Sequence, residues 1–161
     1  MAAKEEIALT VEIQWKETIE TPDWAPDLIT VIEFLLTKLF EKERTVSVYI
    51  TDALEMQRLN VEYRGKDSST DVLSWSYYEE DHSAVHVGDL AVSWDDLCQQ
   101  ADTNGWDAKT EMIRMLVHGC CHLYGLDHER SKDEEIEMLA LEEQLLTHLG
   151  LPGLYDKSPL P

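Results

Sequence analysis

The chain has 161 residues, of which 43% are hydrophobic and 29% are charged, and this composition suits one domain over residues 1–161 with a single buried core. Its 33 Asp and Glu residues against 13 Lys and Arg give a formal net charge of −20, which argues against extended, non-specific DNA binding because polyanions are repelled at long range. Three cysteines without a CxxC pair fit neither a disulfide framework nor a thiolate zinc module. No apolar stretch reaches membrane-spanning length, so we expect a soluble, reduced, cytoplasmic protein without membrane binding.

The first half of the chain alternates predicted strands and helices. Apolar residues at every second position predict a strand over 7–14, and apolar residues at helical spacing predict a helix over 26–42. A second strand is expected over 45–50, followed by a short helix from a capping-box pattern at Thr51 to about Tyr63. The turn-rich, charged segment that follows is expected to be a surface loop.

The second half begins with two strands that we expect to be neighbours, over 71–76 and 87–93, joined by a polar excursion. Ser93, Asp107 and Ser131 are predicted to cap three helices, which end near Gln100, Tyr124 and Leu149. About four strands and five helices in this mixed order predict an α+β fold, with helices packed on a small mixed sheet.

Three of the six histidines fall in the segment 118–128, HGCCHLYGLDH. His118 and His122 are four residues apart, so they share one face of the predicted helix and converge on one side of it. Gly125 is expected to end that helix, and His128 follows where it can complete a ligand set. Three imidazoles without a fourth protein ligand predict a zinc site with an open position for water, although other divalent transition metals also suit imidazole. Such a metal site makes hydroxide available at neutral pH, and we place it on a C-terminal helix and the following turn.

Neighbouring residues narrow the chemistry. Zinc peptidases of the HExxH type carry a glutamate general base after the first histidine, and Gly119 stands there. Asp127 is the better candidate to orient a ligand imidazole, because Glu111, on the same helical stripe, is explained as a first-turn acid. Cys121 is expected to be a buried thiol. The remaining histidines are predicted to be surface residues: His82, His86 and His148.

Three segments together resemble the YbeY family of bacterial single-strand-specific, metal-dependent endoribonucleases implicated in ribosomal RNA maturation. Segment 118–128 is similar to the family signature HGxLHLxGYDH, and segment 59–75, LNVEYRGKDSSTDVLSW, is similar to LNxxYRxKDxPTDVLSF. Segment 87–93, VGDLAVS, is a weaker match to GDIxIS. The matches hold the expected order over about 59–130.

The resemblance implies that His118, His122 and His128 bind zinc and that Arg64 is needed for RNA cleavage. A guanidinium offers a planar donor fork suited to phosphate, which gives Arg64 a chemical role that its sequence position alone does not. Most departures exchange apolar groups, but Leu126 replaces a tyrosine near the metal and removes a phenol there. The departures are Ser69, Trp75, Cys121 and Leu126.

The expected function is therefore a zinc-dependent endoribonuclease that cleaves single-stranded RNA in a narrow His- and Arg-lined cleft, with ribosomal RNA or the ribosome as partner. Seven basic residues in the motif regions allow a local basic cleft on the acidic body, although dispersed solvated charges explain Lys109, Arg114 and Lys132 better. Two alternatives stay open: a zinc peptidase or other metallohydrolase, and a ribosome-associated assembly factor whose metal chiefly holds the C-terminal helices in place. Neither the general base nor the attacking group, water or ribose 2′-OH, follows from the sequence.

Overall fold

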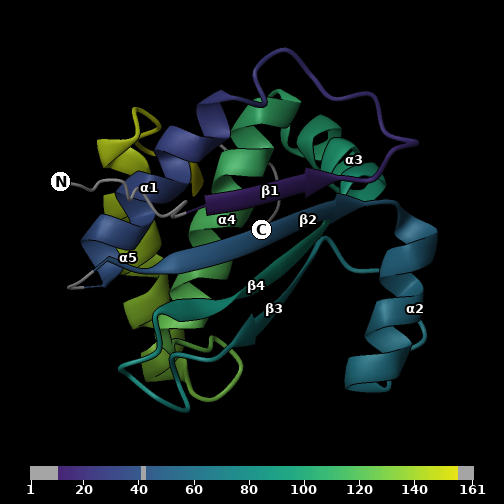
Figure 1. Cartoon of the computed structure of the whole chain (residues 1–161). Helices are drawn as coiled ribbons and strands as arrows, with labels where there is room; N and C mark the ends of the chain where they lie inside the picture. The colour runs from purple at the N-terminus through teal and green to yellow at the C-terminus, as the bar shows by residue number, and fades with distance from the viewer. Residues whose placement is uncertain (1–10, 41–42, 156–161) are drawn as a thin grey trace, which may run out of the picture.

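A computed structural model describes residues 11–40 and 43–155 of the chain. These residues form a sheet and five helices in mixed order (Figure 1). The elements in chain order are β1 (Val11–Trp15), α1 (Asp27–Leu39), β2 (Thr45–Thr51), α2 (Ala53–Arg64), β3 (Val72–Ser76), β4 (His86–Ser93), α3 (Trp94–Asn104), α4 (Ala108–Tyr124) and α5 (Lys132–His148). The predicted α+β class, with about four strands and five helices, is confirmed.

The strands form one mixed sheet in the order β1-β2-β4-β3. β1, β2 and β4 are parallel, whereas β3 pairs with β4 in antiparallel orientation and occupies one edge of the sheet. The strands predicted over 71–76 and 87–93 are therefore neighbours, as expected. Because β3 is an edge strand, residues on α4 and on the chain that leads into β3 can meet beside it.

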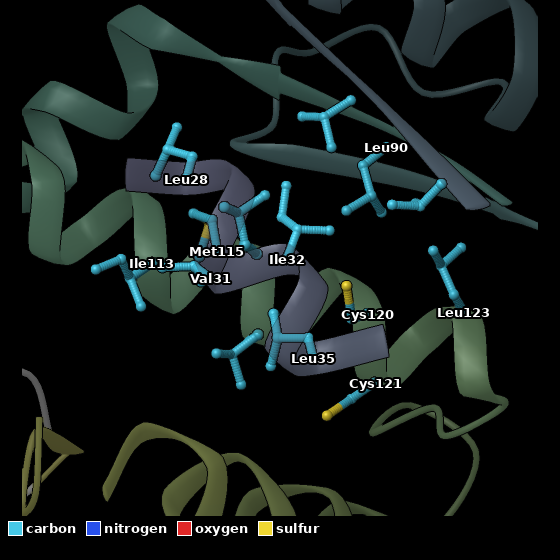
Figure 2. Packing of buried hydrophobic residues seen from close by; sticks show 14 of the residues in the cluster. Leu28, Val31, Ile32, Leu35, Leu90, Ile113, Met115, Cys120, Cys121 and Leu123 are labelled. Atoms are coloured by element: carbon cyan, nitrogen blue, oxygen red, sulfur yellow. The ribbon is translucent and has the colours of Figure 1, made fainter. Parts of the chain in front are cut away.

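The main core lies between one face of the sheet and helices α1, α3 and α4, and it continues to α5, which packs on α4. Leu28, Ile32 and Leu35 of α1 pack against the buried face of α4, and Leu90 reaches the same core from β4 (Figure 2). In contrast, α2 stands to one side of the other helices (Figure 1), and a small second cluster of Met56, Leu73 and Ala91 holds it to the opposite sheet face. The sheet is thus covered unequally, with the main core on one face and α2 with its small cluster on the other.

Three predicted helix N-caps are confirmed. The side chains of Ser93, Asp107 and Ser131 accept hydrogen bonds from the backbone N–H three residues later, as N-caps do. α3 extends one turn beyond its predicted end and stops at Gly105, whose φ of 83° is left-handed. At α2 the cap is Asp52 instead of Thr51, because Thr51 still belongs to β2. The N-terminal part of the predicted first strand, 7–10, lies outside the described residues.

Among residues 11–40 and 43–155, the helices are all too short or too polar to cross a membrane.

Candidate metal centre

α4 and the turn after it bring three histidines together. The helix exposes His118 and His122 on one side while its opposite side is buried, and it ends at Gly125, whose φ of 119° reverses the chain. His128 then returns to the helix, so that one ring nitrogen from each of the three residues lies within 4.8 Å of the others. The ring centroids are 4.7 Å apart for His118 and His122, and 5.3 and 5.5 Å from these to His128. The structure therefore places all three predicted ligands in one cluster.

Burial favours the uncharged state of the central histidine. The pKa of His122 is lowered to about 4, chiefly because burial disfavours the charged ring and because His118 and His128 are close by. A neutral imidazole is the form that binds a metal, so His122 is ready to do so at neutral pH. The rim of the cluster is open, since 39% of the His128 side chain is exposed compared with 21% of the His118 side chain.

The donor set fits a divalent transition metal. Nδ1 of His118 is 2.8 Å from Oε2 of Glu142, which leaves Nε2 as the free ring nitrogen. Nδ1 of His128 is buried without a hydrogen-bond partner in the part of the chain that the structure describes. Buried ring nitrogens seldom lack partners. An unpaired buried nitrogen is what we expect of a metal ligand. Three imidazoles with an accessible rim match the ligand set of open zinc centres.

The three histidines form one wall of a cleft of about 410 Å³. The opposite walls come from β3 and from the end of α2, where Gly65, at a φ of 69°, turns the chain away behind Arg64. Arg64 lines this cleft and lies 4.0 Å from Glu129, measured from Nη2 to Oε1. The structure thus brings Arg64 and the histidine cluster into one cleft, although 54 positions separate Arg64 from the nearest of the three histidines. The residues that line the cleft are Arg64, Thr70, Asp71, Val72, Leu73, Ser74, Ser76, Glu79, His118, His122, Leu126, Asp127, His128 and Glu129.

Charge in this cleft is mixed and mostly negative. Arg64 is accompanied by four carboxylates, those of Asp71, Glu79, Asp127 and Glu129. The suggested local basic cleft is therefore wrong for the described residues. Most of the basic side chains proposed for it pair with acids, in the pairs Arg58–Glu55, Lys109–Asp27, Arg114–Glu111, Arg130–Glu134 and Lys132–Glu135.

Asp127 is part of the cleft, but its carboxylate has a backbone partner. Its Oδ1 accepts a hydrogen bond of 2.9 Å from the N–H of Glu129, which lowers the pKa of Asp127. Among the described residues, the carboxylate that hydrogen-bonds a cluster histidine is that of Glu142, on α5. Glu142 is not recognisable from the sequence, because 24 positions separate it from His118 and only the packing of α5 on α4 brings the two together.

Other residues considered from the sequence lie away from the cluster. Glu111 is fully buried and pairs with Arg114, so it orients no histidine. His86 is held by Thr45 and Asp89. His82 and His148 are exposed, as predicted. Both thiols of α4 are buried (Figure 2), and burial raises the pKa of Cys120 to about 12, so neither resembles a thiolate ligand.

The tertiary structure gives a steric reason why a glycine stands at position 119. α4 approaches β4 so closely that a Cβ at position 119 would lie 2.9 Å from Cδ2 of Leu90. A glutamate there would point into the core and not toward the histidines. A glutamate base at position 119 is therefore incompatible with the way α4 packs on the sheet.

A family model and individual related proteins point to the same family. The family described as Endoribonuclease YbeY matches residues 10–150. A relative of that name from Roseiflexus sp. (strain RS-1) is 42% identical over 113 residues, which cover 66% of this chain and 71% of the relative. Another, from Hydrogenovibrio crunogenus, is 33% identical over 143 residues, with coverages of 85% and 89%.

The fold itself recurs in a solved structure. The solution structure of TM1509 from Thermotoga maritima aligns with a TM-score of 0.58 at 24% identity, and covers 87% of this chain and 91% of that one. This likeness supports the arrangement of the sheet and helices. The match over residues 10–150 and the relatives above show that the chain belongs to the YbeY endoribonuclease family.

Proposed function

We propose that this protein is a single-domain, single-strand-specific, zinc-dependent endoribonuclease. We further propose that it acts in ribosomal RNA maturation, at the 3′ end of the small-subunit RNA, and in ribosome quality control in the cytoplasm. The observation that carries the proposal is that Arg64 and the three clustered histidines line the same cleft. Membership of a family whose curated relatives bear the name endoribonuclease supports RNA as the substrate.

The residues of the cleft divide the work of phosphodiester cleavage. His118, His122 and His128 would hold the metal, which when bound supplies Lewis acidity and lowers the pKa of water toward about 7. Arg64 would bind the scissile phosphate through its planar donor fork and stabilise the charge that grows on it. Arg64 is half-exposed and 4.0 Å from the Glu129 carboxylate, so a phosphate can replace that carboxylate as its partner.

Acidic residues in the cleft set a limit on substrate binding. Four carboxylates line it with one guanidinium. Arg130 pairs with one of them, Glu79, at 3.5 Å, and a bound metal would add positive charge at the histidines, so phosphates away from Arg64 and the metal would be repelled. Few phosphates can then be held, those close to Arg64 and to the metal. This fits a flexible single strand that enters locally, with the ribosome presenting it, better than a rigid duplex. Asp127, whose charge raises the pKa of His122, would assist the ligand set electrostatically.

An assembly role for the metal is the second candidate. The cluster joins α4 to the following turn, and the bond from His118 to Glu142 continues to α5, so metal binding would also fix the C-terminal helices. A peptidase is disfavoured because Gly119 faces Leu90 of the core. RNA cleavage by the purified protein distinguishes the nuclease from both alternatives.

The test compares wild type with Arg64→Ala, His122→Ala and the control Arg58→Ala, on single-stranded RNA, duplex RNA and an unfolded protein. Arg58 lies on the same helix as Arg64, and its side chain is 70% exposed. We expect wild type and Arg58→Ala to cleave single-stranded RNA alone. Arg64→Ala should lose about 100-fold or more in rate while keeping its fold and metal, because a donor to the developing charge is removed.

Intact RNA after incubation with folded, metal-loaded wild type would disprove the nuclease proposal. Cleavage retained in Arg64→Ala would remove the role of Arg64 alone. The ends of the products identify the attacking group, because attack by the ribose 2′-OH leaves a cyclic phosphate whereas attack by water does not.

A further inference from the structure

A buried hydrogen-bond chain leads from the histidine cluster to the segment after α5. Glu142 is 3% exposed, and its Oε2 lies 2.8 Å from Nδ1 of His118. The hydroxyl of Tyr155 donates to the other carboxylate oxygen, Oε1. Both oxygens of Glu142 therefore have a partner, one from α4 and one from the chain beyond α5.

The contact with Glu142 decides which nitrogen of His118 carries the proton. A carboxylate is only an acceptor, so Nδ1 of the neutral ring must be the N–H. Nε2 then carries the lone pair, which is what a metal ligand requires. Because the side chains of His118 and Glu142 are 21% and 4% exposed, water competes little for this bond.

Tyr155 holds Glu142 in place from the other side. Burial and the charge of Glu142 raise the pKa of Tyr155, so its hydroxyl stays protonated and remains a donor. The guanidinium of Arg114 lies 6.0 Å from the centre of the Tyr155 ring, and Arg114 is itself held by Glu111 at 2.7 Å. Burying a carboxylate without hydrogen-bond partners costs free energy. Glu142 is therefore held in the one position in which it keeps its partners.

We propose that Glu142 and Tyr155 are positioning residues of the metal centre. Glu142 fixes the tautomer and the ring orientation of His118, and Tyr155 fixes Glu142. The segment after α5 thereby contributes to metal affinity although it does not touch the histidines in the described contacts. The inference rests on the metal site of the proposed function, but it concerns a hydrogen bond that can be observed without a metal.

The experiment measures zinc affinity by competition with a chromophoric chelator for wild type, Glu142→Leu, Glu142→Gln and Tyr155→Phe. Leucine removes both acceptors at similar volume, glutamine keeps one oxygen that can accept from His118, and phenylalanine removes only the hydroxyl. Glu143→Leu is the matched control, since Glu143 is the next residue on α5. We expect Glu142→Leu to weaken zinc binding by about 10- to 100-fold and Tyr155→Phe to weaken it less. Glu142→Gln should keep most of the wild-type affinity.

A second measurement uses the metal-free protein. Long-range ¹⁵N–¹H NMR correlations of the histidine rings should show His118 as the Nδ1–H tautomer in wild type and Glu143→Leu, and a mixture of tautomers in Glu142→Leu. Wild-type zinc affinity together with an unchanged tautomer in Glu142→Leu would overturn the proposal. If Glu142→Leu fails to fold, Tyr155→Phe is the deciding variant. Unchanged zinc affinity and an unchanged His118 signal in Tyr155→Phe would then refute the proposal that Tyr155 and Glu142 position His118.

Failure of the proposed function has a different signature. In that case wild type would neither bind zinc nor cleave RNA, while the NMR comparison of His118 in the metal-free variants would still test the role of Glu142.

Discussion

His122 is the clustered histidine whose pKa falls to about 4, because burial and the two neighbouring rings disfavour its charged form. It lies on the same face of α4 as His118, one turn closer to the helix end. The third ring comes from the turn after Gly125. The loss of His122 would leave two imidazoles that belong to different segments, and these make a much weaker site.

We predict that His122→Ala loses most of its bound zinc. Protein purified without chelators should contain about one equivalent of metal as wild type and less than about a tenth of that as His122→Ala, because one of three ligands is missing. His148→Ala is the control, since His148 lies at the exposed end of α5. Elemental analysis of the folded proteins checks this, and equal metal content in all three would contradict the ligand assignment.

At the scale of single elements, α2 matters because it carries Arg64 to the cleft while packing lightly on the sheet. Glu55 anchors the first turn of α2 to the sheet, because its carboxylate accepts hydrogen bonds from the hydroxyls of Tyr49 and Thr51 on β2. Lys16, just after β1, lies 3.3 Å from the same carboxylate. Glu55 therefore joins α2 to the ends of two strands.

The stability that Glu55 provides should depend on pH. The Thr51 hydroxyl and the other donors lower the pKa of Glu55 below the unfolded value of about 4.3. A lowered folded pKa means that the stabilisation is fully present above about pH 4.3 and is lost as the pH falls through the folded value. Glu55→Gln should thus cost about 1–2 kcal/mol at pH 7, and less at pH 3.

Urea unfolding of wild type and Glu55→Gln at the two pH values measures this difference. Glu62→Gln, an exposed change on the same helix, should stay within about 0.5 kcal/mol of wild type at both. A constant gap between wild type and Glu55→Gln across the pH range would show that ionisation of Glu55 plays no part.

Two glycines show how closely α4 and β3 approach β4. A Cβ at Gly88 would lie 2.4 Å from the backbone oxygen of Trp75 and 2.5 Å from Cδ2 of Leu123. The nearest atoms to a Cβ at Gly119 would be those at the end of the Leu90 side chain, the first at 2.9 Å. Backbone cannot yield as a side-chain end can. We predict that Gly88→Ala costs about 3 kcal/mol or more, and Gly119→Ala about 1–2 kcal/mol at most, since alanine also favours the helix.

Chemical unfolding of the two glycine variants checks this order. A Gly88→Ala protein as stable as Gly119→Ala would mean that β3 and α4 have more room beside β4 than the contacts indicate.

On the scale of the whole molecule, a formal charge of −20 surrounds a cleft that holds one guanidinium. Charge on the remote edge of the sheet should repel RNA without touching the site. β1 lies at the opposite edge from β3, and Glu12 and Glu17 are exposed there. The acidic exterior would then help the protein release RNA that does not reach the cleft.

Replacing both residues, as Glu12→Gln with Glu17→Gln, should strengthen non-specific RNA binding by about two- to threefold at low salt. The gain should shrink near 0.1 M salt, where screening acts over about 10 Å. The cleavage rate at saturating RNA should not change, because neither residue lies in the cleft. Fluorescence anisotropy with a non-cognate RNA measures the affinity, and no gain at low salt would count against this role of the surface charge.

Local sequence pattern was sufficient for most of the fold. Residue periodicity and capping side chains act within a few positions, so the caps at Ser93, Asp107 and Ser131 and the order of strands and helices could be predicted. The His118 and His122 pair was predictable for the same reason, since helical spacing alone puts the two on one face. The resemblance to a family added Arg64, which spacing did not indicate.

The rest required the tertiary structure, because it depends on contacts between segments that lie far apart in the chain. Only the packing of α5 on α4 sets Glu142 against His118, and only the approach of α4 to β4 leaves Gly119 no space for a larger side chain. The sequence by itself therefore determined the elements, their caps and three histidines ready to converge. The tertiary structure decided which carboxylates surround them, since side chains on separate elements meet only where the shared core positions those elements.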